Sequence, residues 1–217
     1  MTKTVLITFL LLGAGLFASY AALSEQPLEV PFAAQDAVIS APVKPKTNLA
    51  LARSAETQIG KTLYYDPAYV SLPYPNGDVP EDRGVCSDVV IRALRLQGAD
   101  LQQLVHKDMK ANFSSYPARW GLKKPDTNID HRRVPNLETY FNRHRMGEPI
   151  TFNPKDYQPG DIVSWRLTNG LPHIGIVTDS YTSDGRPLVV HNIGSGARVE
   201  DILFLWTING HYRYFSE

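Results

Sequence analysis

The hydrophobic pattern of the chain changes from helical spacing in the first half to short strand-like runs in the second half. Apolar residues recur every three to four positions in the first half, which is typical of amphipathic helices. The later runs are rich in Val, Ile and Trp, and we expect strands over 161–166, 173–178, 188–191, 199–206 and 210–215. Helices followed by an antiparallel meander predict an α+β fold, with the N-terminal helices packed on an antiparallel sheet of about five to six strands.

Capping residues and glycines set the limits of the expected helices. The first begins with Asn48 as its cap and ends at Gly60, and the second runs from around Cys86 to Gly98. Two more begin with Asp100 and Asn136 as caps, and the segment 113–135 between them is expected to be an ordered loop. The apolar stripe of the first helix comprises Leu51, Ala52, Ala55 and Ile59.

The N-terminus has the pattern of an export signal. Lys3 precedes the apolar run Val5–Ala18, and small residues follow at Ser19 and Ala21. We therefore expect a signal peptide over 1–21, a flexible Pro/Ala-rich spacer over 22–47 and one domain over 48–217. The alternative is an uncleaved anchor, but the run is shorter than the ~20 residues of a spanning helix. The expected protein is periplasmic or secreted, without stable membrane insertion after signal removal.

Composition excludes several classes of protein. The chain has 22 Lys plus Arg and 22 Asp plus Glu, so no net field favours a nucleic acid. Hydrophobic residues make up 43%, as in a globular domain. The single cysteine excludes a disulfide within the chain and a multi-cysteine zinc site. We expect a monomer that needs no metal and no cofactor.

Cys86 is the first candidate functional residue, because an unpaired thiol is unusual in an exported protein. It follows Gly84 and stands where the second helical stripe begins. Free N–H groups and the helix dipole at that end favour a thiolate, which a nucleophile requires. The alternative is an inert core cysteine.

Two of the six histidines lie in apolar strand patterns, where a polar ring needs a partner. These are His173 and His191. If the two strands form a hairpin centred on residue 182, the histidines face each other, with Cβ atoms ~5 Å apart. A cysteine at a helix start with two facing histidines provides a nucleophile, a base and a group that orients the base. The other four histidines, His106, His131, His144 and His211, are interpreted as solvated or structural.

The order of these motifs resembles the NlpC-type branch of the papain-like cysteine peptidases. The matching segments are Gln58–Gly60 with Tyr64–Tyr65, Val85–Asp88 for the nucleophile, Pro159–Trp165 for a Gly-Asp strand, His173–Val177 and Val189–Asn192. Asp88 replaces the glycine that the nucleophile motif usually carries, and the interval between Cys86 and His173 is long. In these respects the chain is more similar to an uncharacterised bacterial envelope family known as domain of unknown function 1287.

The resemblance implies a cysteine hydrolase, an amidase or endopeptidase acting on the peptides of cell-wall peptidoglycan. Cys86 would attack an amide carbonyl, His173 would take the thiol proton or hold the thiolate as an ion pair, and His191 would orient His173. The Cys86 N–H and the Tyr65 hydroxyl would stabilise the oxyanion. Asp88 and Asn192 are auxiliary candidates, and the candidates for binding substrate carboxylates are Arg83, Arg132 and Arg133.

Two other classes of function remain open at this stage. The fold could bind or organise wall fragments without cutting them, which the unusual Asp88 allows. Alternatively, Cys86, His173 and His191 could provide three ligands to a zinc ion.

Overall fold

The computed structural model describes residues 47–215. The expected signal peptide and almost all of the expected spacer therefore lie outside the described residues. Within 47–215, no helix is both long enough and apolar enough to cross a membrane.

Within this described range, four α-helices form where the apolar stripes predict them, with different ends in two cases. They are α1 (Asn48–Glu56), α2 (Cys86–Leu96), α3 (Leu101–Asn112) and α4 (Val134–Arg143), and 3₁₀ turns occupy Phe113–Ser115, Asp130–Arg132 and Pro154–Asp156. Thr47, and not Asn48, caps α1 by accepting from the Ala50 N–H. Helix α1 also ends before Ile59, whose side chain is 44% exposed. Helix α4 begins before Asn136, since Pro135 fits its first turn.

Five strands form one antiparallel sheet, in the spatial order β6-β5-β4-β3-β7. They are β3 (Ile162–Arg166), β4 (Pro172–Tyr181), β5 (Pro187–His191), β6 (Arg198–Glu200) and β7 (Thr207–Tyr212). The expected strand over 199–206 was wrong in length, because β6 ends at Glu200. The simple meander was also wrong, because β7 crosses to the far edge and pairs with β3. A short parallel pair, β1 (Tyr64–Tyr65) and β2 (Arg83–Gly84), lies apart from this sheet.

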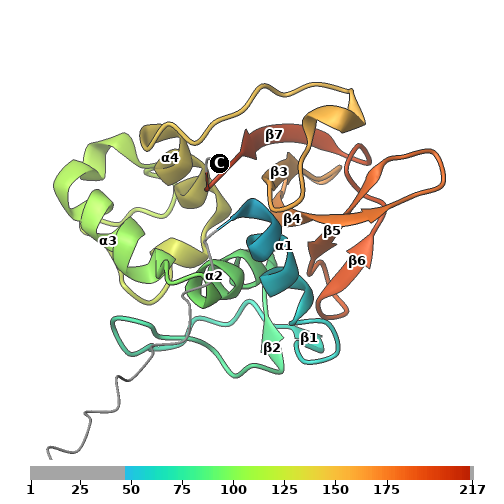
Figure 1. Cartoon of the computed structure of the whole chain (residues 1–217). Coiled ribbons are helices and arrows are strands. Elements are labelled where there is room, and N and C mark those ends of the chain that lie inside the picture. Colours follow the sequence, from blue (N-terminus) through green and yellow to red (C-terminus); the bar gives the residue numbers. More distant parts are fainter. Residues whose placement is uncertain (1–46, 216–217) are drawn as a thin grey trace, which may run out of the picture. The chain divides into compact units, whose positions relative to one another are not determined.

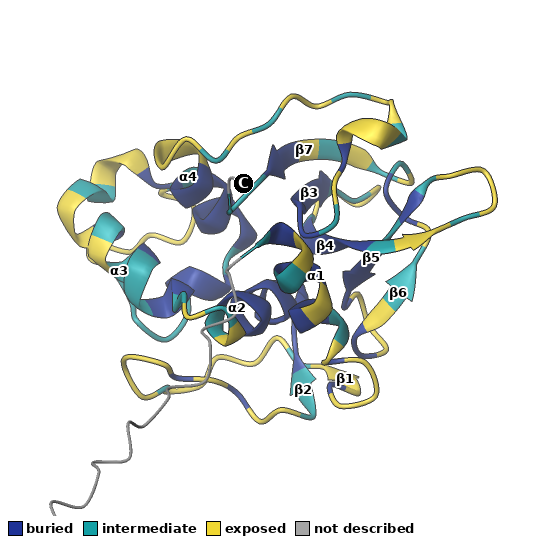
Figure 2. Cartoon of the chain, in the orientation of Figure 1, coloured by how far each residue is buried: buried dark blue, intermediate teal, exposed yellow. Residues whose placement is uncertain are grey.

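The helices pack against one face of the sheet, as an α+β fold requires. Helices α1 and α2 lie against β4 (Figure 1). Where the helices and this strand meet, their residues are buried (Figure 2). The segment after β6 covers the other face, where Leu203 packs with Trp165 and Val177. Central residues of the helical core are Leu51, Val90, Leu94, Leu137, Phe141, Ile174 and Ile176.

A buried ion pair fixes the N-terminal end of α2. The Asp88 carboxylate accepts from the Val85 N–H at 2.6 Å, which caps the helix. The same carboxylate receives two hydrogen bonds from the Arg132 guanidinium, each at 2.9 Å. The two side chains are only 4% and 2% exposed. In addition, the Ser87 hydroxyl donates to the Arg132 carbonyl at 2.7 Å. The start of α2 is thus held against the 3₁₀ turn Asp130–Arg132.

This pair predicts a large loss of stability when one partner is removed. Arg132→Met leaves a buried carboxylate without its counter-charge, so the free energy of unfolding should fall by about 3–5 kcal/mol. Arg186→Met is the matched control, since Arg186 pairs with Asp201 at the surface and the two side chains are 35% and 39% exposed. That change should cost less than about 1 kcal/mol. Equal losses in urea unfolding would contradict this account of the pair.

Candidate active site

Cys86 is the first residue of α2, as the sequence predicts, and it is 5% exposed. The pKa of its thiol is raised to about 12, chiefly by burial and against the opposing effect of the backbone of Ile174, Ser87 and Cys86 itself. The nearby Asp88 carboxylate adds to the rise. The expected thiolate is therefore wrong for the resting protein, because desolvation outweighs the helix N-terminus.

His173 and His191 are hydrogen-bonded to each other, with His173 Nε2 and His191 Nδ1 2.9 Å apart. Both rings are buried, at 2% and 1% exposure. The strand register differs from the expected one by two residues. Ile176 pairs with Val190, which centres the hairpin on residue 183 and places His191 opposite Gly175. A shift of two residues keeps both histidines on one face, and His191 reaches His173 diagonally.

Gly175 leaves the space that this diagonal contact uses. A Cβ atom at this position would lie 2.7 Å from Val189 Cγ1, 2.8 Å from the Val190 carbonyl oxygen and 3.1 Å from His191 Cβ. These distances are shorter than ordinary contacts, and the carbonyl belongs to the backbone of the neighbouring strand. The absence of a side chain therefore allows β4 and β5 to approach with His191 above the glycine.

Both histidines are neutral in the resting site. Burial, with a smaller contribution from His191, lowers the pKa of His173 to about 3. Burial also lowers the pKa of His191, against the opposing effect of Glu200. The rings of Trp165 and Trp206 lie 5.8 and 5.7 Å from the His173 ring. The resting combination is consequently a thiol and a neutral imidazole, not an ion pair.

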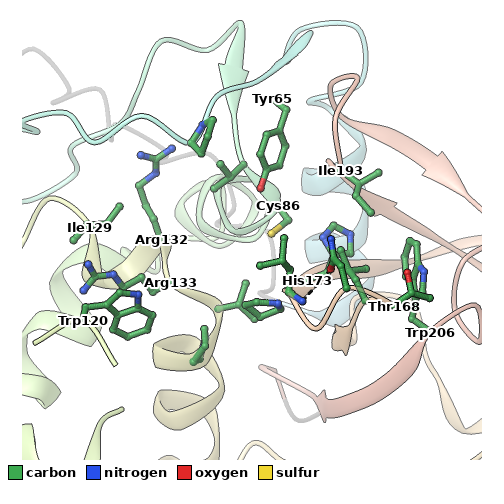
Figure 3. A pocket seen from close by; sticks show the side chains of 18 residues that line it. Tyr65, Cys86, Trp120, Ile129, Arg132, Arg133, Thr168, His173, Ile193 and Trp206 are labelled. Carbon is green, nitrogen blue, oxygen red and sulfur yellow. Dashed lines mark hydrogen bonds between the residues drawn. The ribbon is translucent and has the colours of Figure 1, made fainter. Parts of the chain in front are cut away.

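A cavity of about 600 Å³ contains Cys86 and His173 in its lining, together with Tyr65. The backbone of Ile174, the residue after His173, is close enough to the sulfur to lower the thiol pKa, so thiol and imidazole lie at the same corner. Figure 3 shows the Tyr65 hydroxyl directed toward Cys86. Burial and the two acidic groups Cys86 and Asp88 raise the pKa of Tyr65 to about 12, so the hydroxyl remains a donor. Most of the remaining lining is apolar, including Val85, Trp120, Ile129, Val134, Pro135, Leu167, Leu171, Ile193 and Trp206.

Four of the candidate residues have structural contacts instead. Asp88 caps α2 and pairs with Arg132, so it cannot stabilise an oxyanion. The Arg132 guanidinium donates to Asp88 and to the carbonyls of Ala68 and Asp66. Asn192 lies outside the cavity lining and donates to the carbonyls of Tyr64 and Gly84. Arg83 is also outside the lining. It contacts Asp82 and Asp66.

Arg133 also lines the cavity, and its side chain is 17% exposed, although its partner Asp130 is buried. Its guanidinium lies 4.1 Å from the Trp120 ring centroid and contacts the Asp130 carboxylate at 3.2 Å. A cation held on an aromatic face at the cavity wall can still meet a carboxylate.

Sequence reasoning missed Glu200. Its carboxylate Oε2 lies 2.8 Å from His191 Nε2, on the side opposite His173. Glu200 is the last residue of β6, and only the pairing of β5 with β6 brings it to His191. No local motif marks such a residue. Glu200 could have been found only by limiting the strand expected over 199–206 correctly, because the pairing of that shorter strand with β5 brings Glu200 to His191.

Within residues 47–215, no group of three or more His, Cys, Asp or Glu side chains is arranged to hold a metal ion. The zinc alternative would also require the bond between His173 Nε2 and His191 Nδ1 to break. Of the other histidines, His131 and His211 are buried, and His211 Nε2 contacts Asp161 at 2.8 Å.

Comparisons with known proteins identify relatives of the chain. A family model described as "Domain of unknown function (DUF1287)" matches residues 52–214. "Uncharacterized protein YijF" of Escherichia coli (strain K12) is 66% identical over 173 residues, which are 80% of this chain and 84% of YijF.

Two solved structures from Trichomonas vaginalis are also similar, NlpC1 and NlpC2. Their sequence identities are 16% and 17%, their TM-scores are 0.40 and 0.43, and the matches cover 77% and 84% of this chain. The chain spans about half of each of them, 45% and 53%. Both TM-scores are below 0.5, so nothing about activity follows from these two likenesses.

The space at Gly175 gives a direct test of the histidine pairing. Gly175→Ala should push β5 away and separate the histidine rings, and it should lower the free energy of unfolding by about 1–3 kcal/mol. Gly194→Ala is the matched control, because a Cβ there would meet nothing within 4 Å. Urea unfolding measures both. A Gly175→Ala protein as stable as the control would contradict the close approach.

The buried neutral histidines predict an acid-sensitive fold. The ordinary histidine pKa of 6.5 applies to the unfolded chain, whereas burial lowers the pKa of His131 to about 4 and that of His173 to about 3. The unfolded chain therefore binds more protons below pH 6.5, and the free energy of unfolding should fall between pH 6.5 and pH 4. Each tenfold difference in proton affinity is worth about 1.4 kcal/mol. His131→Gln should flatten the pH curve in urea unfolding, and equal stability at pH 7 and pH 4.5 would contradict the account.

Proposed function

The chain belongs to the family described as Domain of unknown function (DUF1287), and we propose that it is a cysteine hydrolase that cuts amide bonds in cell-wall murein peptides. The observation that carries this proposal is the common position of Cys86 and His173 in one cavity wall, with His191 hydrogen-bonded behind His173. A nucleophile, a base and an orienting group in this order form the arrangement of known thiol hydrolases.

The resting state favours general-base attack over a preformed ion pair. His173 Nε2 is engaged by His191, so Nδ1 is the ring nitrogen left for the thiol. As the Cys86 sulfur bonds to the substrate carbonyl carbon, its proton passes to His173. The protonated His173 then gives that proton to the leaving amine, and a thioester remains on Cys86. Water, activated by His173, hydrolyses the thioester and restores the thiol.

The cavity provides donors for the negative charge that develops on the carbonyl oxygen. The Cys86 N–H is at the helix start, and the Tyr65 hydroxyl is directed toward the same sulfur. A tyrosine that keeps its proton at neutral pH can donate to an oxyanion. Tyr65 is therefore assigned to this role.

Two features support murein peptides as the substrate class. Stem peptides of the wall carry free carboxylates, and Arg133 is placed at the cavity wall to meet one. The N-terminal sequence also has the pattern of an export signal. Export would bring the protein to the cell wall, where such peptides occur. We place the mature protein in the periplasm or medium, as a monomer that uses no metal.

Digestion of purified murein peptides, followed by mass spectrometry, tests the proposal. Cys86→Ala should abolish cleavage and His173→Ala should lower it by about 10²–10⁴-fold. His191→Ala should cost less, and His191→Gln should recover part of the loss because an amide oxygen can accept from His173. His144→Ala is the control, since this half-exposed histidine lies outside the cavity. His131 is buried and therefore unsuitable for this purpose.

The same experiment separates catalysis from binding. A burial-raised thiol pKa also suits a protein that holds wall fragments without cutting them, so this is the second candidate function. Murein peptides bound equally by wild type and Cys86→Ala, with no cleavage by either protein, would replace the hydrolase with a binding module.

A further inference from the structure

Three side chains form a continuous hydrogen-bonded line behind the thiol. Glu200 Oε2 lies 2.8 Å from His191 Nε2, and His191 Nδ1 lies 2.9 Å from His173 Nε2. The two imidazoles are almost fully buried, whereas the Glu200 side chain is 42% exposed. The line therefore runs from the substrate cavity at His173 to the solvent at Glu200.

The chemistry of the outer end determines where each proton lies. A carboxylate can only accept, so His191 must carry its proton on Nε2. A neutral imidazole has one N–H, which leaves His191 Nδ1 as an acceptor. His173 must then donate to it from Nε2, and its own Nδ1 carries no proton. This is the tautomer that a general base for Cys86 needs.

The surroundings of His191 offer a route to solvent that avoids the substrate cavity. A second cavity of about 40 Å³ is lined by His191 and Glu200, and Ile193 lines both this cavity and the larger one. The other charged residue in its lining is Arg198, whose Nε donates to the Ser195 carbonyl. On the substrate side, the titratable groups in the lining with His173 are Cys86, Tyr65, Arg132 and Arg133. Glu200 is thus the acidic group that contacts the histidine pair.

We propose that Glu200 is a positioning residue that fixes the tautomers of His191 and His173, so that an unprotonated His173 Nδ1 faces Cys86. This inference rests on the proposed function and extends it to a fourth residue, which touches neither the substrate nor the thiol. Glu200 also connects the histidine pair to solvent when substrate fills the larger cavity.

The tautomers can be observed directly, without any substrate. ¹⁵N NMR of histidine-labelled protein distinguishes protonated from unprotonated ring nitrogens, and His173→Gln and His191→Gln variants assign the two rings. In the wild type both rings should carry the proton on Nε2. In Glu200→Gln the amide NH₂ can donate to His191, so forms with the proton on Nδ1 should appear. Asp201→Asn is the control, since the neighbouring Asp201 pairs with Arg186, and it should leave the spectrum unchanged.

A kinetic measurement accompanies the spectra. Glu200→Gln should slow murein-peptide cleavage by about 10-fold or more across the pH range, as with other outer partners that fix a histidine tautomer. Normal cleavage with unchanged tautomers in Glu200→Gln would overturn this inference and leave the hydrolase standing. Wild-type spectra with the His191 proton on Nδ1 would overturn it as well. The expected spectra with no cleavage by the wild type would reject the proposed function alone.

Discussion

The buried hydrogen bond between His173 and His191 is the contact on which the rest of the site depends. It joins neighbouring strands of the sheet, and it requires the glycine at position 175 and the register that sets His191 opposite that glycine. With Nε2 of His173 occupied, only Nδ1 remains for the thiol. Cys86 is held at the same cavity independently, because the Asp88–Arg132 ion pair fixes the start of α2. Two buried polar contacts, one in the sheet and one at the helix end, thus determine where Cys86 and His173 lie.

Burial gives this site a different resting state from that of a thiolate enzyme. A helix N-terminus ordinarily favours a cysteine anion, but at Cys86 desolvation has the larger effect and raises the pKa to about 12. Burial also lowers the pKa of His173 to about 3, so its imidazole is neutral at all higher pH values. In the proposed mechanism the base is therefore unprotonated at any ordinary pH, and proton transfer accompanies attack on the carbonyl. A neutral thiol is also less open to oxidation than a thiolate, which would protect an unpaired cysteine at the proposed location outside the cytoplasm.

The sequence allowed the fold class and the positions of Cys86, His173 and His191 in the fold to be predicted, because both depend on local pattern. Helical stripes, capping residues and apolar strands placed Cys86 at a helix start and both histidines on neighbouring strands. The errors concern long-range pairing. The return of β7 to β3 and the two-residue register shift are decided by packing between distant segments, as is the contact of Glu200 with His191. Arg132 shows the same limit: its sequence context suits a substrate-binding residue, and only the fold reveals that Asp88 neutralises it.

The most direct measurement uses the fact that Cys86 is the only cysteine of the chain. Iodoacetamide can therefore modify one defined thiol, and mass spectrometry of the peptide that contains Cys86 reports the modified fraction. Cleavage of murein peptides should then fall in proportion to that fraction and reach zero when every Cys86 is modified. Far-UV circular dichroism of the fully modified protein checks that the fold persists. Cleavage that continues at the original rate with Cys86 fully modified would contradict the central claim that this sulfur is the nucleophile.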